Sequence, residues 1–333
     1  MKVDIRDVAK AAGVSIATVS RVLNDKDRVS PETRQRVRAA VEACGFMPDP
    51  VARSMIRKST QAVGVLVPTL SNEFWAEVAE ALQARLRSAG YTLMLSSLGG
   101  LPQSDASVLL KAMADRRMDG IILGGIELQD EDRALLKVRG VPVVGFDQED
   151  GELACVGVDN RQAALDATRH LLSLGHRRIA CVGVGREPDA RMEGYRLAMR
   201  AADLKPMESL VLSDPDDLRC GYDACRSLLA STPGFTGLFC WNDLLAIGAI
   251  NALRDAGLRT PQDVSVIGVD DIYMADRIMP RLTTMRQPVG EMGAAAVDML
   301  LQRLAGDPVQ DAERQRIFRM TLVERESCMA WSR

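Results

Sequence analysis

The sequence predicts an α/β protein in which a small helical head precedes two doubly wound parallel-sheet subdomains. Two observations lead to this fold class. The first 45 residues carry apolar positions spaced three and four apart, the repeat of short amphipathic helices. From residue 61 onward, short β-rich runs alternate with amphipathic helical stretches in two successive series. A length of 333 residues leaves room for two or three domains.

Composition and charge exclude several classes of protein. Hydrophobic residues make up 47% of the chain and charged residues 26%, which is typical of a globular protein. No apolar run approaches the roughly 20 residues that span a membrane, and the N-terminus has no apolar signal region, so we expect a cytoplasmic protein without a membrane partner. Seven scattered cysteines without CxxC spacing predict reduced thiols, and two histidines exclude a multi-histidine metal centre. We expect neither a metal nor a cofactor.

The net charge of -3 is unevenly distributed along the chain. Residues 1–60 hold 12 Lys and Arg against 7 Asp and Glu, a balance of +5. The other 273 residues hold 30 against 38, a balance of -8. This asymmetry predicts a small basic head on a larger acidic body.

The head has the pattern of a helix-turn-helix unit. Residues 5–12 form an apolar helical stripe that ends at Gly13, and Ser15 is a suitable N-cap for a second helix over residues 16–23. Two short helices joined by three or four residues with a glycine describe this motif. A third helix starts after Ser30 and stops at Gly45. The alternative is a generic three-helix bundle with a solvated polar face.

The second helix of such a unit lies in the major groove of DNA, with its N-terminal residues towards the base edges. Ile16 and Ala17 then face bases, where Ile16 can contact a thymine methyl group, and Arg21 can reach a guanine with two hydrogen bonds. Hydroxyl side chains on this helix suit phosphate oxygens, which fix register rather than sequence: Ser15, Thr18 and Ser20.

The stretch after the head predicts a short hinge helix. Asp49 can cap a helix that starts at Pro50 and lasts barely two turns, before the polar linker 57–60. Such a helix is marginal alone in water, but it can form when two copies pack together and insert an apolar residue into the minor groove. The alternative is an ordinary interdomain linker.

Residues 7–24, 29–34 and 52–54 closely resemble the opening of the lactose-repressor (LacI/GalR) family of bacterial transcription regulators. The resemblance implies a homodimer that binds a pseudo-palindromic operator. It also implies that Met55 stands where the family usually has a leucine wedge, and that Asp49 replaces a usual asparagine. The implied DNA-binding residues are Ser15, Ile16, Ala17, Thr18, Ser20, Arg21, Asn24, Ala52, Arg53 and Met55.

The β-rich runs of the body fall at residues 62–68, 91–95, 120–123 and 141–147, and then at 178–183, 237–240 and 264–270. Near-continuous apolar strands between helices predict parallel sheets covered on both faces. Ligands of such sheets bind beyond the carboxyl ends of the strands. The polar residues just past each run are therefore the candidates for a ligand site.

Carboxylate, amide, guanidinium and aromatic side chains follow these runs, a set that suits a polyol. The resemblance implies that the small-molecule effector contacts Phe74, Trp75, Asp147, Arg191, Asn242 and Asp270. For each residue an alternative stays open, because aspartates at strand ends often cap helices and either aromatic residue can be part of the core. Arg186 can hold a carboxylate or phosphate, but a solvated loop charge is the favoured interpretation.

The resemblance extends to the end of the chain and includes residues 257–268 and 280–288. It implies a DNA-binding domain at 1–47, a hinge at 48–60, and an effector and dimerisation domain at 61–333 that is similar to periplasmic sugar-binding proteins. The implied N-subdomain holds 61–160 and 289–320, and the implied C-subdomain holds 161–288 and 321–333. Residues 317–320 and 322–325 predict a final strand pair. No leucine heptads follow, which favours a dimer.

Together these observations predict a transcriptional regulator that acts as a repressor and whose operator affinity is controlled by a sugar, sugar acid or sugar phosphate. Residues 68–72 are similar to gluconate-type regulators. One alternative is a sugar-binding transport or sensor protein without DNA specificity. A carbohydrate-active enzyme with Asp147 and Asp270 as its acid–base pair is another, but the sequence shows no nucleophile beside an activating base. We therefore expect no enzymatic activity.

Overall fold

The computed structural model describes residues 4–23, 29–46, 59–99, 101, 105–116, 118–148, 153–184, 189–211, 218–232, 234–306 and 314–332. The chain divides into two compact units, Met1–Thr60 and Gln61–Arg333. We describe each unit by itself.

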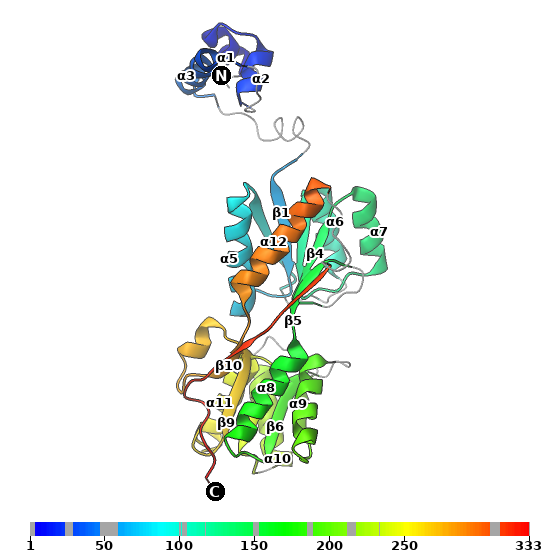
Figure 1. The fold of residues 1–333 in the computed structure, drawn as a ribbon, viewed down its shortest axis with the longest axis vertical. Coiled ribbons are helices and arrows are strands. Elements are labelled where there is room, and N and C mark those ends of the chain that lie inside the picture. Colours follow the sequence, from blue (N-terminus) through cyan, green and yellow to red (C-terminus); the bar gives the residue numbers. More distant parts are fainter. Residues whose placement is uncertain are drawn as a thin grey trace. The chain divides into compact units, whose positions relative to one another are not determined.

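The first unit is a three-helix head (Figure 1). Its helices are α1 (Ile5–Ala12), α2 (Ile16–Leu23) and α3 (Pro31–Cys44). Their starts are fixed by side-chain caps. Asp4 accepts from the N–H groups of Arg6 and Asp7 before α1, and Ser30 accepts from that of Thr33 before α3. One apolar residue from each helix is fully buried in the shared core: Val8, Val19 and Val37.

The first sheet of the body, which we call the N-lobe, has six parallel strands in the order β11-β5-β4-β3-β1-β2. Its strands are β1 (Ala62–Val67), β2 (Thr92–Ser97), β3 (Gly120–Gly124), β4 (Val143–Phe146), β5 (Cys155–Val158) and β11 (Gln315–Phe318). Helices α5 (Glu73–Ser88) and α12 (Val289–Ala305) pack on one face, and α6 (Ala106–Asp115) and α7 (Asp130–Arg139) on the other.

The second sheet, which we call the C-lobe, has the order β12-β10-β9-β8-β6-β7. Its strands are β6 (Ile179–Val184), β7 (Met207–Val211), β8 (Gly237–Cys240), β9 (Ser265–Asp270), β10 (Thr283–Arg286) and β12 (Thr321–Val323). Helices α8 (Asn160–Ser173) and α9 (Ala190–Ala201) cover one face, and α10 (Leu218–Ser231) and α11 (Asp243–Asp255) the other. Only β12 runs antiparallel to its neighbour among these described strands.

The chain passes between the two lobes three times, after β5, after β10 and after β11 (Figure 1). The last passage corrects the predicted final strand pair. β11 pairs with β5 in the N-lobe, whereas β12 pairs with β10 in the C-lobe. The two residues between them carry the chain from one sheet to the other, so the strands do not pair with each other.

The structure confirms the predicted fold class: a helical head and two mainly parallel α/β layers in the body. Strands β5, β7 and β10 were not predicted from the sequence. Within the described ranges, every helix is too short or too polar to cross a bilayer.

Candidate DNA-binding and effector sites

Helix α2 has one buried face and one exposed face. Val19 and Val22 are buried in the head, while Ile16 keeps 45% of its surface exposed and Ala17 and Arg21 are also exposed. The predicted base-reading residues therefore lie together on the open face. The α2 dipole adds its positive N-terminal end to that face, which favours contact with phosphates.

Ser15 fixes the start of this helix. Its Oγ accepts from the N–H of Thr18 at 3.2 Å and lies 3.0 Å from the Thr18 Oγ1. Both hydroxyls are therefore engaged with one another in the free head, and contact with a phosphate would compete with this pairing. Ser20 is partly buried on the same helix.

Several predicted site residues lie outside the described residues. These are Asn24, Ala52, Arg53 and Met55 of the DNA-binding set, the hinge helix that starts at Asp49, and Arg186.

Arg191 is the centre of the polar cluster in the C-lobe. It lies in the first turn of α9, is 5% exposed, and its guanidinium packs 4.5 Å from the ring centroid of Trp241. Its Nε donates to Asn160 Oδ1 at 2.6 Å, and its Nη1 donates to the Trp241 carbonyl at 2.7 Å. Its Nη2 donates to Asp270 Oδ1 at 3.4 Å. The side chain is thus fixed on three sides.

The ring of Trp241 is held by the same cluster. Its Nε1 donates to Asp189 Oδ2 at 2.9 Å, and the other oxygen of Asp189 caps α9 by accepting from the Met192 N–H. A ring fixed by its nitrogen and stacked on a guanidinium forms a rigid apolar wall beside the charged groups.

Asp270 ends β9 with a φ of 117°. Its Oδ1 accepts from Gln287 Nε2 at 2.9 Å as well as from Arg191. Gln287 is 3% exposed, and its Oε1 is a buried oxygen that no described group satisfies. An unsatisfied buried acceptor costs about 1–3 kcal/mol, which marks this corner as one that a hydroxyl or water can stabilise.

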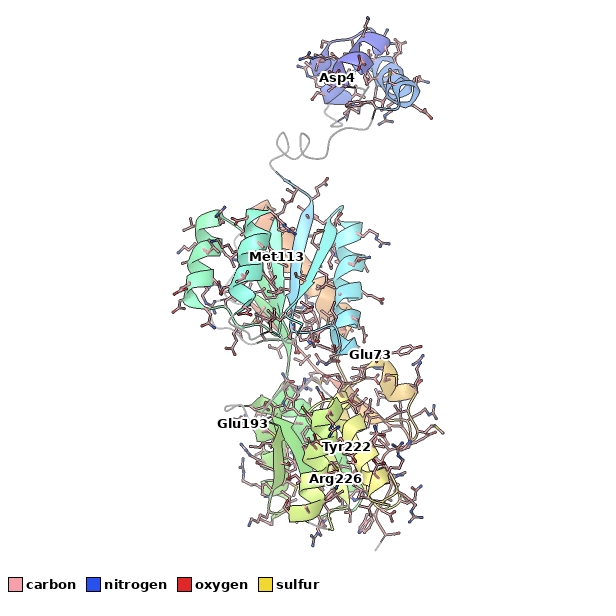
Figure 2. The ribbon with its side chains drawn as sticks, turned by 180° about the vertical axis from the view of Figure 1, so that it is seen from behind. Asp4, Glu73, Met113, Glu193, Tyr222 and Arg226 are labelled. Atoms are coloured by element: carbon pink, nitrogen blue, oxygen red, sulfur yellow. The ribbon has the colours of Figure 1, made fainter. Side chains whose placement is uncertain are left out.

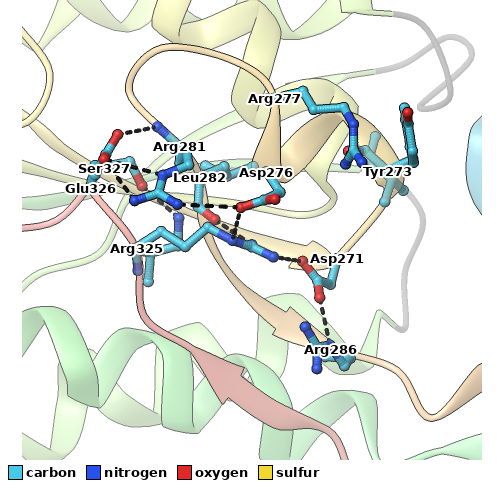
Figure 3. Close-up of polar contacts among 12 residues, drawn as sticks. Asp271, Tyr273, Asp276, Arg277, Arg281, Leu282, Arg286, Arg325, Glu326 and Ser327 are labelled. Carbon is cyan, nitrogen blue, oxygen red and sulfur yellow. Dashed lines mark hydrogen bonds and ion pairs between the residues drawn. The ribbon is translucent and has the colours of Figure 1, made fainter.

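The next carboxylate along the chain has different partners. Asp271 accepts from Arg286 Nε at 2.5 Å and from Arg325 Nη2 at 2.6 Å (Figure 3). Asp271 also has a positive φ, of 63°, and its side chain shares no partner with that of Asp270 among these hydrogen bonds. Asp270 therefore belongs to the Arg191 cluster, and Asp271 belongs to a separate ion-pair cluster with Arg286 and Arg325.

Asn242 and Asp243 stabilise the fold around this corner. Asn242 is 1% exposed, and its Oδ1 caps α11 by accepting from the Leu245 N–H at 2.9 Å. Asp243 is fully buried and accepts from the Thr284 hydroxyl and the Ile272 N–H. Burial, and then the nearby Asp270 carboxylate, raise the pKa of Asp243 well above its usual value.

Phe74 and Trp75 lie in the first turn of α5 in the N-lobe and are 3% and 5% exposed. Their ring centroids are 4.9 Å apart in an edge-to-face arrangement. Trp75 covers the glycines at the end of β3, where an added Cβ on Gly124 would come within 2.5 Å of its ring. Both aromatic residues thus pack as core, which was the alternative left open for them.

Asp147 follows β4 with a φ of 54°, and its N–H donates to the Val156 carbonyl at 2.7 Å. Of the six predicted effector residues, the structure joins Arg191 and Asp270 directly and places Asn242 next to Trp241 in the same cluster. Phe74 and Trp75, in the first turn of α5, and Asp147, directly after β4, belong to the other lobe.

Two family models match the chain. Residues 4–49 match the model of bacterial regulatory proteins of the lacI family, and residues 168–328 match that of the periplasmic binding protein-like domain. The HTH-type transcriptional regulator RegA of Clostridium saccharobutylicum is 34% identical, over 98% of this chain and 99% of its own. The chain belongs to the LacI family.

Solved structures of the family have the same fold. The Lac repressor dimer bound to operator and the anti-inducer ONPF matches 99% of this chain and 100% of its own, with a TM-score of 0.85 and 26% identity. The CelR–cellobiose complex matches 98% of this chain and 99% of its own, with a TM-score of 0.71 and 28% identity. This LacI-family protein is therefore a DNA-binding transcriptional regulator and not an enzyme.

The LacI-family regulator has polar cluster residues that the sequence did not reveal. Asn160, Trp241 and Gln287 complete the hydrogen bonds of Arg191 and Asp270. Asn160 and Gln287 each lie at a passage between the lobes, a position that the strand pattern could have indicated. Across the described part of the chain, His, Cys, Asp and Glu form no cluster suited to a metal ion.

Proposed function

We propose that this regulator is a repressor whose operator affinity is set by a sugar bound between the two lobes. The observation that carries the proposal is the cluster of Arg191, Trp241 and Asp270 at the carboxyl ends of the C-lobe strands. It combines a fixed ring, a guanidinium and a carboxylate, which can stack on a sugar face and exchange hydrogen bonds with its hydroxyls. Asp147 contributes from the N-lobe, whereas Phe74 and Trp75 are buried in its core.

The effector in this proposal is a neutral sugar. The positive charge of Arg191 is already opposed by Asp270, while Asp189 adds a second carboxylate beside Trp241. An anionic group at this cluster would meet more carboxylates than guanidinium groups among the described residues. Relatives are consistent with a neutral ligand: CelR is solved with cellobiose, and a LacI-family regulator of Enterococcus faecium, 28% identical, with ribose.

The DNA-bound form in the proposal is a cytoplasmic homodimer with one head on each half of a pseudo-palindromic operator. The Lac repressor was solved as a dimer on its operator, which supports this assembly. We propose the subdomain limits 61–160 with 289–320 and 161–288 with 321–333, a head at 1–47 and a hinge at 48–60. The DNA contacts come from the residues named above for α2 and the hinge.

Selection from random duplexes tests the proposal, with the salt concentration varied and a panel of sugars added to the selected pool. We expect enrichment of a palindrome and a change in its affinity with one neutral sugar, of about 5- to 150-fold. If the protein binds a sugar but enriches no palindrome, it is a sugar-binding protein without DNA specificity. If it enriches a palindrome that no sugar affects, the effector assignment is wrong.

A further inference from the structure

A hydrogen bond joins the two lobes between residues that are 201 positions apart. Glu73 is the first residue of α5 in the N-lobe, and its Oε2 accepts from the backbone N–H of Met274 at 2.9 Å. Met274 lies in the short 3-10 helix η2 (Tyr273–Asp276) of the C-lobe. Figure 2 shows Glu73 at the end of α5 nearest to that segment.

A second carboxylate of α5 is close to the same segment. Glu77 lies one helical turn after Glu73, and desolvation followed by the Asp271 carboxylate raises its pKa, while Arg286 lowers it. Glu77 therefore lies within electrostatic range of the ion-pair cluster at Asp271. The N-terminal half of α5 therefore interacts with the C-lobe in two ways: Glu73 accepts a hydrogen bond, and the Glu77 carboxylate is close to the charges of Asp271 and Arg286.

The segment from Asp270 to Met274 has little freedom to move within itself. Its first two residues are anchored by four side chains: Arg191, Gln287, Arg286 and Arg325. The N–H of Ile272 donates to Asp243 Oδ2 at 3.0 Å, and Ile272 is 2% exposed. This anchored segment connects the polar cluster at Asp270 to the contact at Met274.

We propose that Glu73 is the positioning residue through which the N-lobe responds to the state of Asp270. The inference rests on the proposed function, in which Asp270 contacts the effector. A sugar that changes the hydrogen bonds of Asp270 shifts the segment, and the shift makes or breaks the contact between Met274 and Glu73. Because α5 packs against α12 and the N-lobe sheet, the relative position of the lobes then depends on the effector.

Four variants of the full chain test this contact and separate it from a general charge effect. Glu73→Ala removes the acceptor, and Glu73→Gln keeps an acceptor oxygen without the charge. Glu80→Ala is the matched control, because it removes an exposed glutamate from the same helix. Asp270→Asn perturbs the other end of the segment.

Amide hydrogen exchange of the peptide that covers residues 271–278, measured by mass spectrometry, reports on the hydrogen bond between Met274 and Glu73 without any effector. We expect Glu73→Ala to speed exchange at Met274 by about 3- to 10-fold, the range of one lost hydrogen bond. Glu73→Gln should recover most of the protection, and Glu80→Ala should match the wild type. Asp270→Asn should also speed exchange at Met274, but add little in the Glu73→Ala background, since coupled residues are not additive.

Equal exchange in Glu73→Ala and Glu80→Ala overturns the proposal, and so do additive effects of Asp270→Asn and Glu73→Ala. Failure of the proposed function has a different result: no palindrome is enriched from random duplexes, or no sugar changes its affinity, whatever the exchange data show. With an effector in hand, Glu73→Ala should reduce its effect on operator affinity by about 3- to 10-fold relative to Glu80→Ala. An unchanged effect contradicts a role of Glu73 in the response.

Discussion

Asp270 and Asp271 are adjacent carboxylates with different partners, and both adopt a positive φ, of 117° and 63°. A side chain other than glycine in this region costs on the order of 1–3 kcal/mol, so the surrounding contacts have to hold it there. Arg191 and Gln287 hold the first carboxylate, and Arg286 and Arg325 the second. Strain of this kind is concentrated at functional sites, which supports Asp270 as an effector contact.

Asp270→Asn should weaken effector binding about 10- to 100-fold. Asparagine keeps the size of the side chain but leaves the charge of Arg191 without a counter-charge in a site that is 5% exposed. Titration of the effector against the operator complex measures the loss. Asp223→Asn is the control, since it neutralises an exposed aspartate of α10. An unchanged effector response would remove Asp270 from the site.

Arg21→Ala should relax the choice of operator and cost about 1–3 kcal/mol at the cognate base pair. Arg21 is exposed on the open face of α2, where a guanidinium can read a guanine with two hydrogen bonds. Binding to the selected operator and to random duplexes at one salt concentration measures the difference. Equal losses on both kinds of DNA would mean that Arg21 contacts only phosphates.

At the scale of elements, α5 packs closely against the end of β3 because the Trp75 ring lies against Gly124 and Gly125. An alanine at Gly124 would place its Cβ 2.5 Å from the Trp75 ring, so Gly124→Ala should destabilise the protein by about 1–3 kcal/mol through overpacking. Urea unfolding measures the change in the free energy of unfolding. Gly290→Ala in α12 is the control, because an added Cβ there meets nothing within 4 Å. Trp75→Leu should offset part of the loss in the Gly124→Ala background, and additive losses would refute this packing.

The C-terminal segment is fixed to the C-lobe by the buried His176. Its Nδ1 is 3.0 Å from the Thr236 hydroxyl, and its Nε2 lies 3.0 Å from the Ser265 hydroxyl and 3.1 Å from the Met329 carbonyl. Because a carbonyl can only accept, Nε2 carries the proton of the neutral ring. Burial lowers the pKa of His176 below its usual 6.5, so the ring stays neutral in the folded protein.

The free energy of unfolding should therefore fall as the pH drops below about 6.5. In that range the unfolded chain binds a proton at this histidine that the folded protein does not bind, so acid favours unfolding. Burial lowers the pKa of His170 as well, in the same direction. Urea midpoints between pH 5.5 and 7.5 test this, with His176→Gln expected to flatten the dependence. A wild-type midpoint that rises on acidification contradicts the assignment.

Which elements the sequence predicts depends on where their partners lie along the chain. Most of the apolar strands were predicted because their buried residues are consecutive in the sequence, although the short apolar strand β5 was missed. β10 was missed because it contains Thr283 and Thr284, whose partners Ser327 and Asp243 are 44 and 41 residues away. Arg191 and Asp270 were predicted from strand ends and from resemblance, whereas Gln287 joins them only through the fold. Similarly, Phe74 and Trp75 could not be assigned to core or site before their burial was known.

At the scale of the whole molecule, the uneven charge separates two roles. A balance of +5 over residues 1–60 provides the attraction to phosphates, and the body carries -8. A net charge of -3 alone would have argued against a nucleic-acid partner. The acidic body also disfavours anionic ligands, which agrees with the compensated charge of Arg191.

The choice between neutral and anionic effectors follows from this charge balance. A neutral sugar at about 100 times its Kd should stabilise the protein by about 2.7 kcal/mol, while the matching sugar acid and sugar phosphate should give no shift at the same concentration. Thermal unfolding of the full chain measures all three, and Asp270→Asn should reduce the stabilisation by the neutral sugar to about 0.4–1.4 kcal/mol. The similarity of residues 68–72 to gluconate-type regulators makes the opposite prediction. If the acid stabilises more than the neutral sugar, then Arg191 is available to a carboxylate despite its contact with Asp270, and the effector class we propose is wrong.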